Sequence, residues 1–331
     1  MARLQGISAA LAGRLWRTAQ LIGLALTVAL VCGLFVAPEA ALSLLWDIAI
    51  PILPAIFLIN PVIWRNVCPL GTLNMLASGR LRDNLLPGRL LAGANGVGIV
   101  LLLLMVPARR FAFNADGPVL AVTIVAVAVL ALALGALFRR KGGFCNAVCP
   151  VLPVERLYGQ SPLVKIGSAH CADCSQCVPR ACIDVAPAKS GAQTLGRAGC
   201  SHAWLRTGYG IFATSFPGFV LGYYLTTDGP PSGAGSVYLT VAATMLASHA
   251  ASQLLVRGLR LSADTALRLL GALGIGLYYW FAGPVIAGHL ALGAGAALVI
   301  RAAAFALIAL WLWRAFGRPP AGLRRLGSIP R

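Results

Sequence analysis

The sequence predicts an all-α membrane protein with about eight transmembrane helices and a small, cysteine-rich cytoplasmic insertion. Only 11% of its 331 residues are charged and 59% are apolar, whereas soluble domains typically carry about 25% charged residues. The mean hydropathy is +0.82. Several apolar runs also reach the length of about 18 residues that a membrane-spanning helix requires.

Eight apolar runs are long enough to cross a hydrocarbon core of roughly 30 Å at about 1.5 Å per residue. They cover residues 18–37, 41–63, 90–107, 118–138, 208–225, 236–256, 265–282 and 285–313. We expect the first two to form a hairpin through Pro38-Glu39-Ala40, and the last two a hairpin through Gly283-Pro284. The first run exceeds the usual signal-peptide core of about 7–15 residues, so we expect a retained helix.

The basic residues predict the orientation. With the N-terminus inside, the inner segments are 1–17, 64–89, 139–207, 257–268 and 314–331, and they hold 24 of the 27 Lys and Arg; the exceptions are Arg109, Arg110 and Arg301. Cytoplasmic loops carry such an excess of basic residues, so both termini are expected on the cytoplasmic side of a bacterial inner membrane. The formal charge of +18 is explained by this topology, and no nucleic-acid partner is expected.

Nine cysteines are present. Cys32 lies within the first span and is expected to be a small buried hydrophobe. The other eight fall on the predicted cytoplasmic side, where thiols stay reduced. They are Cys68, Cys145, Cys149, Cys171, Cys174, Cys177, Cys182 and Cys200.

The strongest motif is Cys171-Ala-Asp-Cys-Ser-Gln-Cys-Val-Pro-Arg-Ala-Cys182. Three cysteines separated by two residues each are typical of ferredoxin loops that hold an iron–sulfur cluster. The last gap is four residues rather than three and no proline follows Cys182, so the fourth position departs from that pattern. Zinc is the main rival, but zinc sites usually pair their cysteines across a longer loop.

A second pattern occurs twice. Trp64-Arg-Asn-Val-Cys-Pro and Cys145-Asn-Ala-Val-Cys-Pro each follow the inner end of a predicted helix pair, and an apolar tail follows each. This repetition predicts an internal duplication of a hairpin followed by a cysteine loop.

These motifs resemble the membrane-bound polyferredoxins over about residues 40–205. That family includes the quinol-oxidising membrane subunit of periplasmic nitrate reductase systems and the nitrous oxide reductase maturation regulators. The resemblance implies C-x3-C-P loops at the membrane surface, [4Fe–4S] clusters and electron exchange with quinone or soluble carriers. Trp64 stands where the first C-x3-C-P motif would have its leading cysteine, so that loop supplies only Cys68.

Eight cytoplasmic cysteines match two four-cysteine clusters. The expected division places Cys171, Cys174 and Cys177 in one cluster, and Cys68, Cys145 and Cys149 in the other. Ferredoxin logic then assigns Cys182 to the second group and Cys200 to the first. The alternative is a single cluster on the cysteines at 171, 174, 177 and 182, with the remaining cysteines structural.

Polar residues within spans are candidates for function because they are costly in lipid. His249 and His289 differ in predicted depth by well over about 10 Å at 1.5 Å per residue, so a shared haem is not expected. Asp47 and Arg301 are candidates for quinone chemistry, proton transfer or ordinary buried contacts. His170 and His202 lie near candidate ligands, where they would hydrogen-bond cluster sulfur or only solvent.

The predicted organisation is a membrane region over 1–138, a ferredoxin-like cluster region over 139–207 and a second membrane region over 208–331. The expected function is one-electron transfer between a quinone pool or membrane partner and another redox protein, such as a ferredoxin, a flavodoxin or a membrane subunit. The chain would then be a component of a quinol or ferredoxin oxidoreductase. A zinc-stabilised scaffold or maturation factor is the alternative, and a transporter ranks last because no paired broken helices are evident.

Overall fold

The computed structural model describes residues 9–81, 84, 86–139, 141–164, 190–195, 198–199, 201–293 and 295–317. These residues form helices joined by short turns, and no strand occurs among them; an isolated bridge joins Asn84 to Phe138. The predicted all-α membrane class is confirmed. The predicted ferredoxin-like region over 139–207 is described only in part, because residues 140, 165–189, 196–197 and 200 lie outside the described residues.

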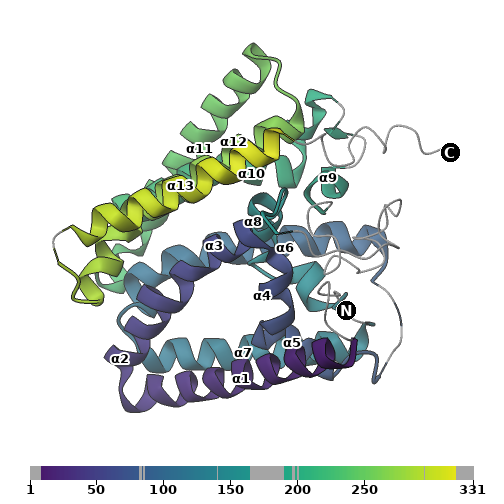
Figure 1. Cartoon of the computed structure of the whole chain (residues 1–331), viewed down its shortest axis with the longest axis vertical. Helices are drawn as coiled ribbons and strands as arrows, with labels where there is room; N and C mark the ends of the chain where they lie inside the picture. The colour runs from purple at the N-terminus through teal and green to yellow at the C-terminus, as the bar shows by residue number, and fades with distance from the viewer. Residues whose placement is uncertain are drawn as a thin grey trace.

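The N-terminal half begins with a long helix, then a broken one, and ends with two long helices joined by the π-helical turn η2 (Arg109–Phe113) (Figure 1). Its helices are α1 (Ala9–Val36), α2 (Pro38–Ser43), α3 (Ile50–Ile59), α4 (Pro61–Val67), α5 (Pro69–Leu76), α6 (Gly88–Ala108) and α7 (Gly117–Leu137). A π-helical turn, η1 (Leu44–Ala49), joins α2 to α3. The first two spans are joined at Ala37, and the predicted turn residues Pro38-Glu39-Ala40 begin α2 instead. Helix α1 packs against α2 and α7, whereas α3 leads away from it in Figure 1.

The second half consists of four long helices that lie beside the first group, and the short helix α8 connects the two halves. Its elements are α8 (Leu152–Tyr158), α9 (Ser190–Leu195), α10 (Gly208–Leu225), α11 (Ala234–Gly258), α12 (Ala263–His289) and α13 (Ala296–Phe316). The N-terminal end of α1 and the C-terminal end of α13 lie on the same side of the array in Figure 1.

Among the described residues, seven helices are long and apolar enough to cross a membrane, one fewer than the sequence predicted. The missing one is 208–225. It forms α10 as expected, but its glycines, Ser215 and Pro217 make it less apolar. Most of α10 is buried against α11 and α12, so it does not need the apolar surface that lipid requires.

The predicted turn at Gly283-Pro284 is wrong. Helix α12 continues through Pro284 to His289, and the chain turns at residues 290–295 instead. Proline is tolerated inside membrane helices because neighbouring groups satisfy the freed carbonyl. Here Pro284 lies in the last turns of α12, close to the helix end.

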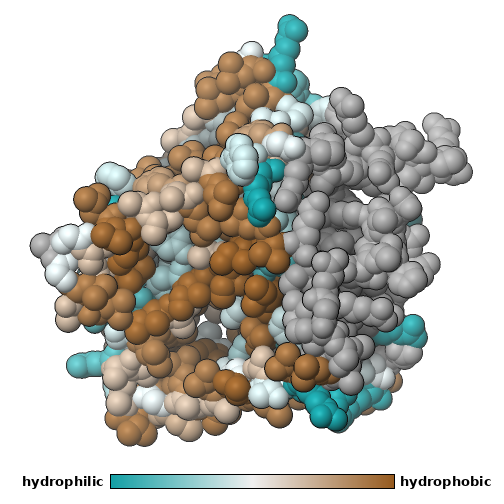
Figure 2. Space-filling view, viewed as in Figure 1, coloured by the Kyte–Doolittle hydropathy of each residue, from teal (hydrophilic) through white to brown (hydrophobic). Residues whose placement is uncertain are grey.

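Large apolar side chains cover the outside of the helices, including Leu21, Leu26, Leu239, Leu246 and Leu298. Figure 2 shows this apolar surface extending across the face formed by the long helices. Soluble monomers rarely expose contiguous apolar patches beyond a few hundred Å². The surface is therefore one that contacts lipid.

Two glycines let α10 and α11 approach closely. Gly218 and Gly222 form a G-x-x-x-G pair, and a Cβ at either position would overlap Thr244 of α11. Small residues at such spacing are typical of membrane helix contacts. Ser248 and Ser252 reinforce this contact by donating to the carbonyl oxygen of Thr214 at 2.8 and 3.3 Å.

Gly222→Ala is expected to lower the free energy of unfolding by about 1–3 kcal/mol, because the added methyl group overpacks this contact. Thermal unfolding in detergent measures the effect. Gly235→Ala in α11 is the matched control, since a Cβ there meets nothing within 4 Å. Equal unfolding temperatures for the two variants would contradict the close contact.

Candidate functional site

The first Cys-Pro loop separates two short helices, α4 and α5. Helix α4 ends at Val67, Cys68 has an extended ψ of 125°, and Pro69 starts α5. This break is expected because proline disfavours the helical conformation of the residue before it and suits the first turn of a new helix. Asn66 accepts at its carbonyl oxygen from Gln20 of α1 at 2.9 Å, which ties the loop to the membrane helices.

The second loop has the same construction. A π-helical turn, η3 (Phe144–Val148), carries Cys145 and ends at Cys149, whose ψ is 121°. Pro150 follows, and α8 begins two residues later at Leu152. The repeated Val-Cys-Pro motif thus produces the same extended backbone at its cysteine twice, while the flanking helical turns differ.

Both loops pack against the middle of a membrane helix and not against its end. A Cβ at Gly98 of α6 would lie 3.0 Å from the carbonyl oxygen of Cys149, and one at Gly23 of α1 would lie 3.0 Å from that of Val67. Gly98 is ten residues into α6, or about 15 Å from its start. The resemblance implied loops at the membrane surface, whereas these loops reach between the helices. Non-helical backbone at such a level is tolerated where protein surrounds it.

The structure brings Cys68, Cys145 and Cys149 together. A Cβ at Gly71 would contact both the Cys145 Sγ, at 3.7 Å, and the Cys68 Cβ, at 3.6 Å. Burial, with added repulsion from the neighbouring Cys68, raises the pKa of the Cys149 thiol to about 12. Burial likewise raises the pKa of Cys145 well above its usual value, with added repulsion from Cys149 and Cys68. The three thiols therefore share one buried space in which a cation would stabilise their thiolates.

Buried charged residues surround these cysteines. Arg65 donates from Nη1 to both Glu155 carboxylate oxygens at 3.1 and 3.0 Å. Its Nη2 donates to Asn146 Oδ1 at 2.5 Å, and Lys141 Nζ donates to its carbonyl oxygen at 2.5 Å. With Arg156, these four charged residues are at most 5% exposed. Three are cationic and one is anionic, which is the balance that suits a buried anionic group.

Some buried donors near the cysteines have no acceptor among the described residues. Arg156 donates from Nη1 to Asn95 Oδ1 at 2.5 Å, but its Nε and Nη2 have no hydrogen-bond partner in the described part of the chain. Within the same residues, Asn146 Nδ2 is likewise buried without a partner. Arg156 and Cys149 line the same cavity of about 430 Å³. Buried donors without acceptors are costly, so an acceptor-rich group such as sulfide or thiolate fits this space.

The remaining predicted ligands, Cys171, Cys174, Cys177, Cys182 and Cys200, lie outside the described residues, as does His170. Among the residues that are described, no group of three or more His, Cys, Asp or Glu is placed to hold a single metal ion. In a [4Fe–4S] cluster each thiolate binds a different iron atom, so its ligands stand further apart than those of one ion. The three described cysteines lie near one another without being placed as ligands of one ion.

The polar residues predicted within spans have individual partners. His249 contacts Thr214 Oγ1 and Gln253 Nε2, each at 2.7 Å. His289 contacts Asp47 at 3.0 Å, and Arg301 stacks on Trp280. His202 is exposed. Cys32 was expected to be buried, but it is exposed on α1, on a surface that contacts lipid.

Sequence reasoning missed the polar and charged residues around the cysteines: Arg65, Lys141, Asn146, Glu155 and Arg156. One signal was available. Glu155 and Arg156 interrupt the apolar tail that follows Cys149-Pro150, and charged residues in an apolar run are candidates for function.

Comparisons of this chain with protein-family models, with curated proteins and with solved structures found no match.

Proposed function

We propose that this protein is a membrane-bound iron–sulfur electron carrier. One [4Fe–4S] cluster would be held by Cys68, Cys145 and Cys149 with Cys182 as the fourth ligand. The other would be held by Cys171, Cys174 and Cys177 with Cys200. The observation that carries the proposal is the meeting of three cysteines from two separate loops in a buried, cation-rich space.

When bound, such a cluster supplies reversible one-electron transfer, and the protein supplies its ligands and surroundings. Arg65, Lys141 and Arg156 would balance the net negative charge of a cluster with four thiolate ligands. The unpartnered donors of Asn146 and Arg156 would hydrogen-bond to its sulfur atoms, which raises the reduction potential by stabilising added negative charge. Burial excludes water from the thiolates.

The partners follow from topology and charge. In the proposed orientation both termini and the cysteine loops face the cytoplasm of a bacterial inner membrane, in keeping with the basic inner segments. The basic residues of segment 139–207 would attract an acidic ferredoxin or flavodoxin. A quinone pool or a membrane subunit would be the other electron partner, and the chain would act as one component of a quinol or ferredoxin oxidoreductase.

Protein purified without oxygen is expected to contain about eight iron atoms and eight acid-labile sulfides per chain, as two four-iron clusters require. Iron, sulfide and zinc analysis with EPR of the reduced protein measures this. Stoichiometric zinc without iron would instead favour the zinc-stabilised scaffold. About four iron atoms per chain would favour a single cluster.

A further inference from the structure

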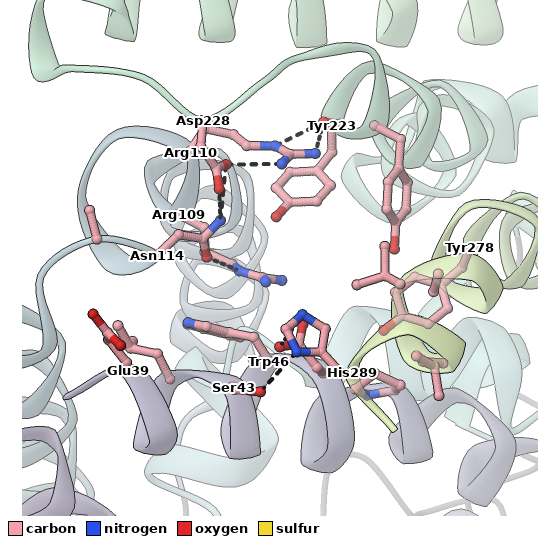
Figure 3. A pocket seen from close by; sticks show the side chains of 18 of the residues that line it. Glu39, Ser43, Trp46, Arg109, Arg110, Asn114, Tyr223, Asp228, Tyr278 and His289 are labelled. Atoms are coloured by element: carbon pink, nitrogen blue, oxygen red, sulfur yellow. Dashed lines mark hydrogen bonds and ion pairs between the residues drawn. The ribbon is translucent and has the colours of Figure 1, made fainter. Parts of the chain in front are cut away.

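A polar chamber of about 760 Å³ lies at the ends of the helices beyond the cysteine loops. It is formed by α2 and η1, the π-helical turn η2 (Arg109–Phe113), the end of α10 with the turn after it, and the C-terminal part of α12. Figure 3 shows its side chains converging from these segments. The proposed cluster chemistry uses none of the residues of this chamber.

Most charged residues in the chamber are paired. His289 Nε2 contacts Asp47 at 3.0 Å, and Ser43 Oγ lies 3.2 Å from His289 Nδ1. Arg110 forms an ion pair with Asp228 at 2.9 Å and donates to the carbonyl oxygen of Tyr223. These contacts pair two of the three acidic and two of the three basic residues that line the chamber; Glu39 and Arg109 form no ion pair among the described residues.

Arg109 is different. Its guanidinium lies over the Trp46 ring, 3.8 Å from the centroid, and 5.4 Å from that of Tyr223. Its Nε donates to Asn114 Oδ1 at 3.2 Å, which fixes the plane of the group. Among the described residues no carboxylate pairs with it, and its terminal nitrogens point into the chamber in Figure 3.

An oriented guanidinium between aromatic rings, with free terminal donors, suits a planar or tetrahedral oxyanion. Tyr278 lines the same space and its hydroxyl makes no hydrogen bond among the described residues, so it offers a further donor. An unpaired cation at the end of a membrane span is costly. A bound anion would offset that cost.

The chamber opens toward apolar space. A second cavity of about 350 Å³ shares Trp46, Arg109, Tyr223, Tyr224 and Tyr278 with the chamber. It extends past Phe57, Leu102 and Phe219 to Pro150 and Val151, beside the second cysteine loop. Apart from Arg109 and the tyrosine hydroxyls, its lining is apolar. The two spaces together therefore match a molecule with a charged head and an apolar tail.

We propose that this chamber binds an amphipathic oxyanion, whose carboxylate or phosphate head pairs with Arg109 and whose single apolar chain occupies the adjoining cavity. The head and the tail are recognised by different elements. The η2 and η1 turns hold the head, and α3, α6 and α10 enclose the tail.

The test titrates the full-length protein, in a neutral maltoside detergent, with dodecyl phosphate, laurate and dodecanol, and counts bound ligand by native mass spectrometry. Both anions are expected to bind at least about tenfold more tightly than dodecanol, as a charge-assisted hydrogen bond to the head allows. Arg109→Gln is expected to remove that advantage, and Arg109→Lys to reduce it. Equal affinity for dodecanol, or unchanged anion affinity in Arg109→Gln, would overturn the proposal.

Arg301→Gln is the matched control, because Arg301 also stacks on a tryptophan, at 4.4 Å, but lies outside the chamber. It should bind both anions like the wild type. Inorganic phosphate separates a lipid-like ligand from a free anion, since it is expected to bind at least about tenfold more weakly than dodecyl phosphate. Equal affinity would refute the tail cavity. The iron content should be the same in all of these variants, so failure here is distinguishable from failure of the cluster proposal.

Discussion

Cys149→Ser is expected to remove about half of the iron and to leave the rest bound. Cysteine supplies all four ligands of a typical [4Fe–4S] cluster, so losing one thiolate weakens one cluster and spares the other. Cys149 is the most informative ligand to change, because its thiol is buried and it lines the same cavity as Arg156. Serine keeps nearly the same volume, which limits the effect on packing.

Iron and sulfide analysis, with EPR of the reduced protein, measures this loss. Cys171→Ser should remove the other half, so the EPR signals of the two variants should be complementary. Cys32→Ser is the matched control, since Cys32 is exposed on α1 and should not alter the iron content. Loss of all iron in both ligand variants, with unfolding temperatures like that of the wild type, would show a single cluster. Unchanged iron in Cys149→Ser would exclude Cys149 as a ligand.

The helices could be predicted from the sequence because each apolar run carries its own signal. The runs at 90–107 and 118–138 became α6 and α7 with shifts of a few residues at their ends. The errors lie where tertiary contacts decide. Pro284 was taken as a turn, but packing in α12 keeps the helix intact around it. Cys32 was expected to be buried because a uniformly apolar span does not show which of its faces contacts lipid.

The candidate site could be predicted only in part, for the same reason. The repeated Val-Cys-Pro motif gives the local break at Cys68 and at Cys149, since the proline acts on its own neighbour. The pairing of Arg65 with Glu155 depends on packing between segments 90 positions apart. The Arg109 chamber is assembled from the ends of several helices, and no local pattern marks it. Such contacts are set by the fold and not by neighbouring residues.

Arg65→Met is expected to lower the free energy of unfolding by about 3–5 kcal/mol, because it leaves the Glu155 carboxylate buried without its cation. Both side chains are nearly inaccessible, at 4% and 6% exposed. Chemical unfolding in detergent measures the loss. Asp228→Asn is the matched comparison, since its carboxylate pairs with Arg110 but is 56% exposed. That change is expected to cost no more than about 1 kcal/mol.

Variants of Glu155 distinguish an ion pair that only stabilises the fold from one that also helps to hold a cluster. With a cluster bound, Glu155→Gln leaves Arg65 beside an anionic group, so the cation remains compensated and the protein should lose less stability than Arg65→Met does. The double variant Arg65→Met/Glu155→Leu removes both charges and should regain stability, as buried pairs replaced by apolar residues often do. It should nonetheless bind less iron, because one of the cations that balance the thiolates is gone. If the double variant regained both stability and full iron content, Arg65 would have no part in holding the cluster.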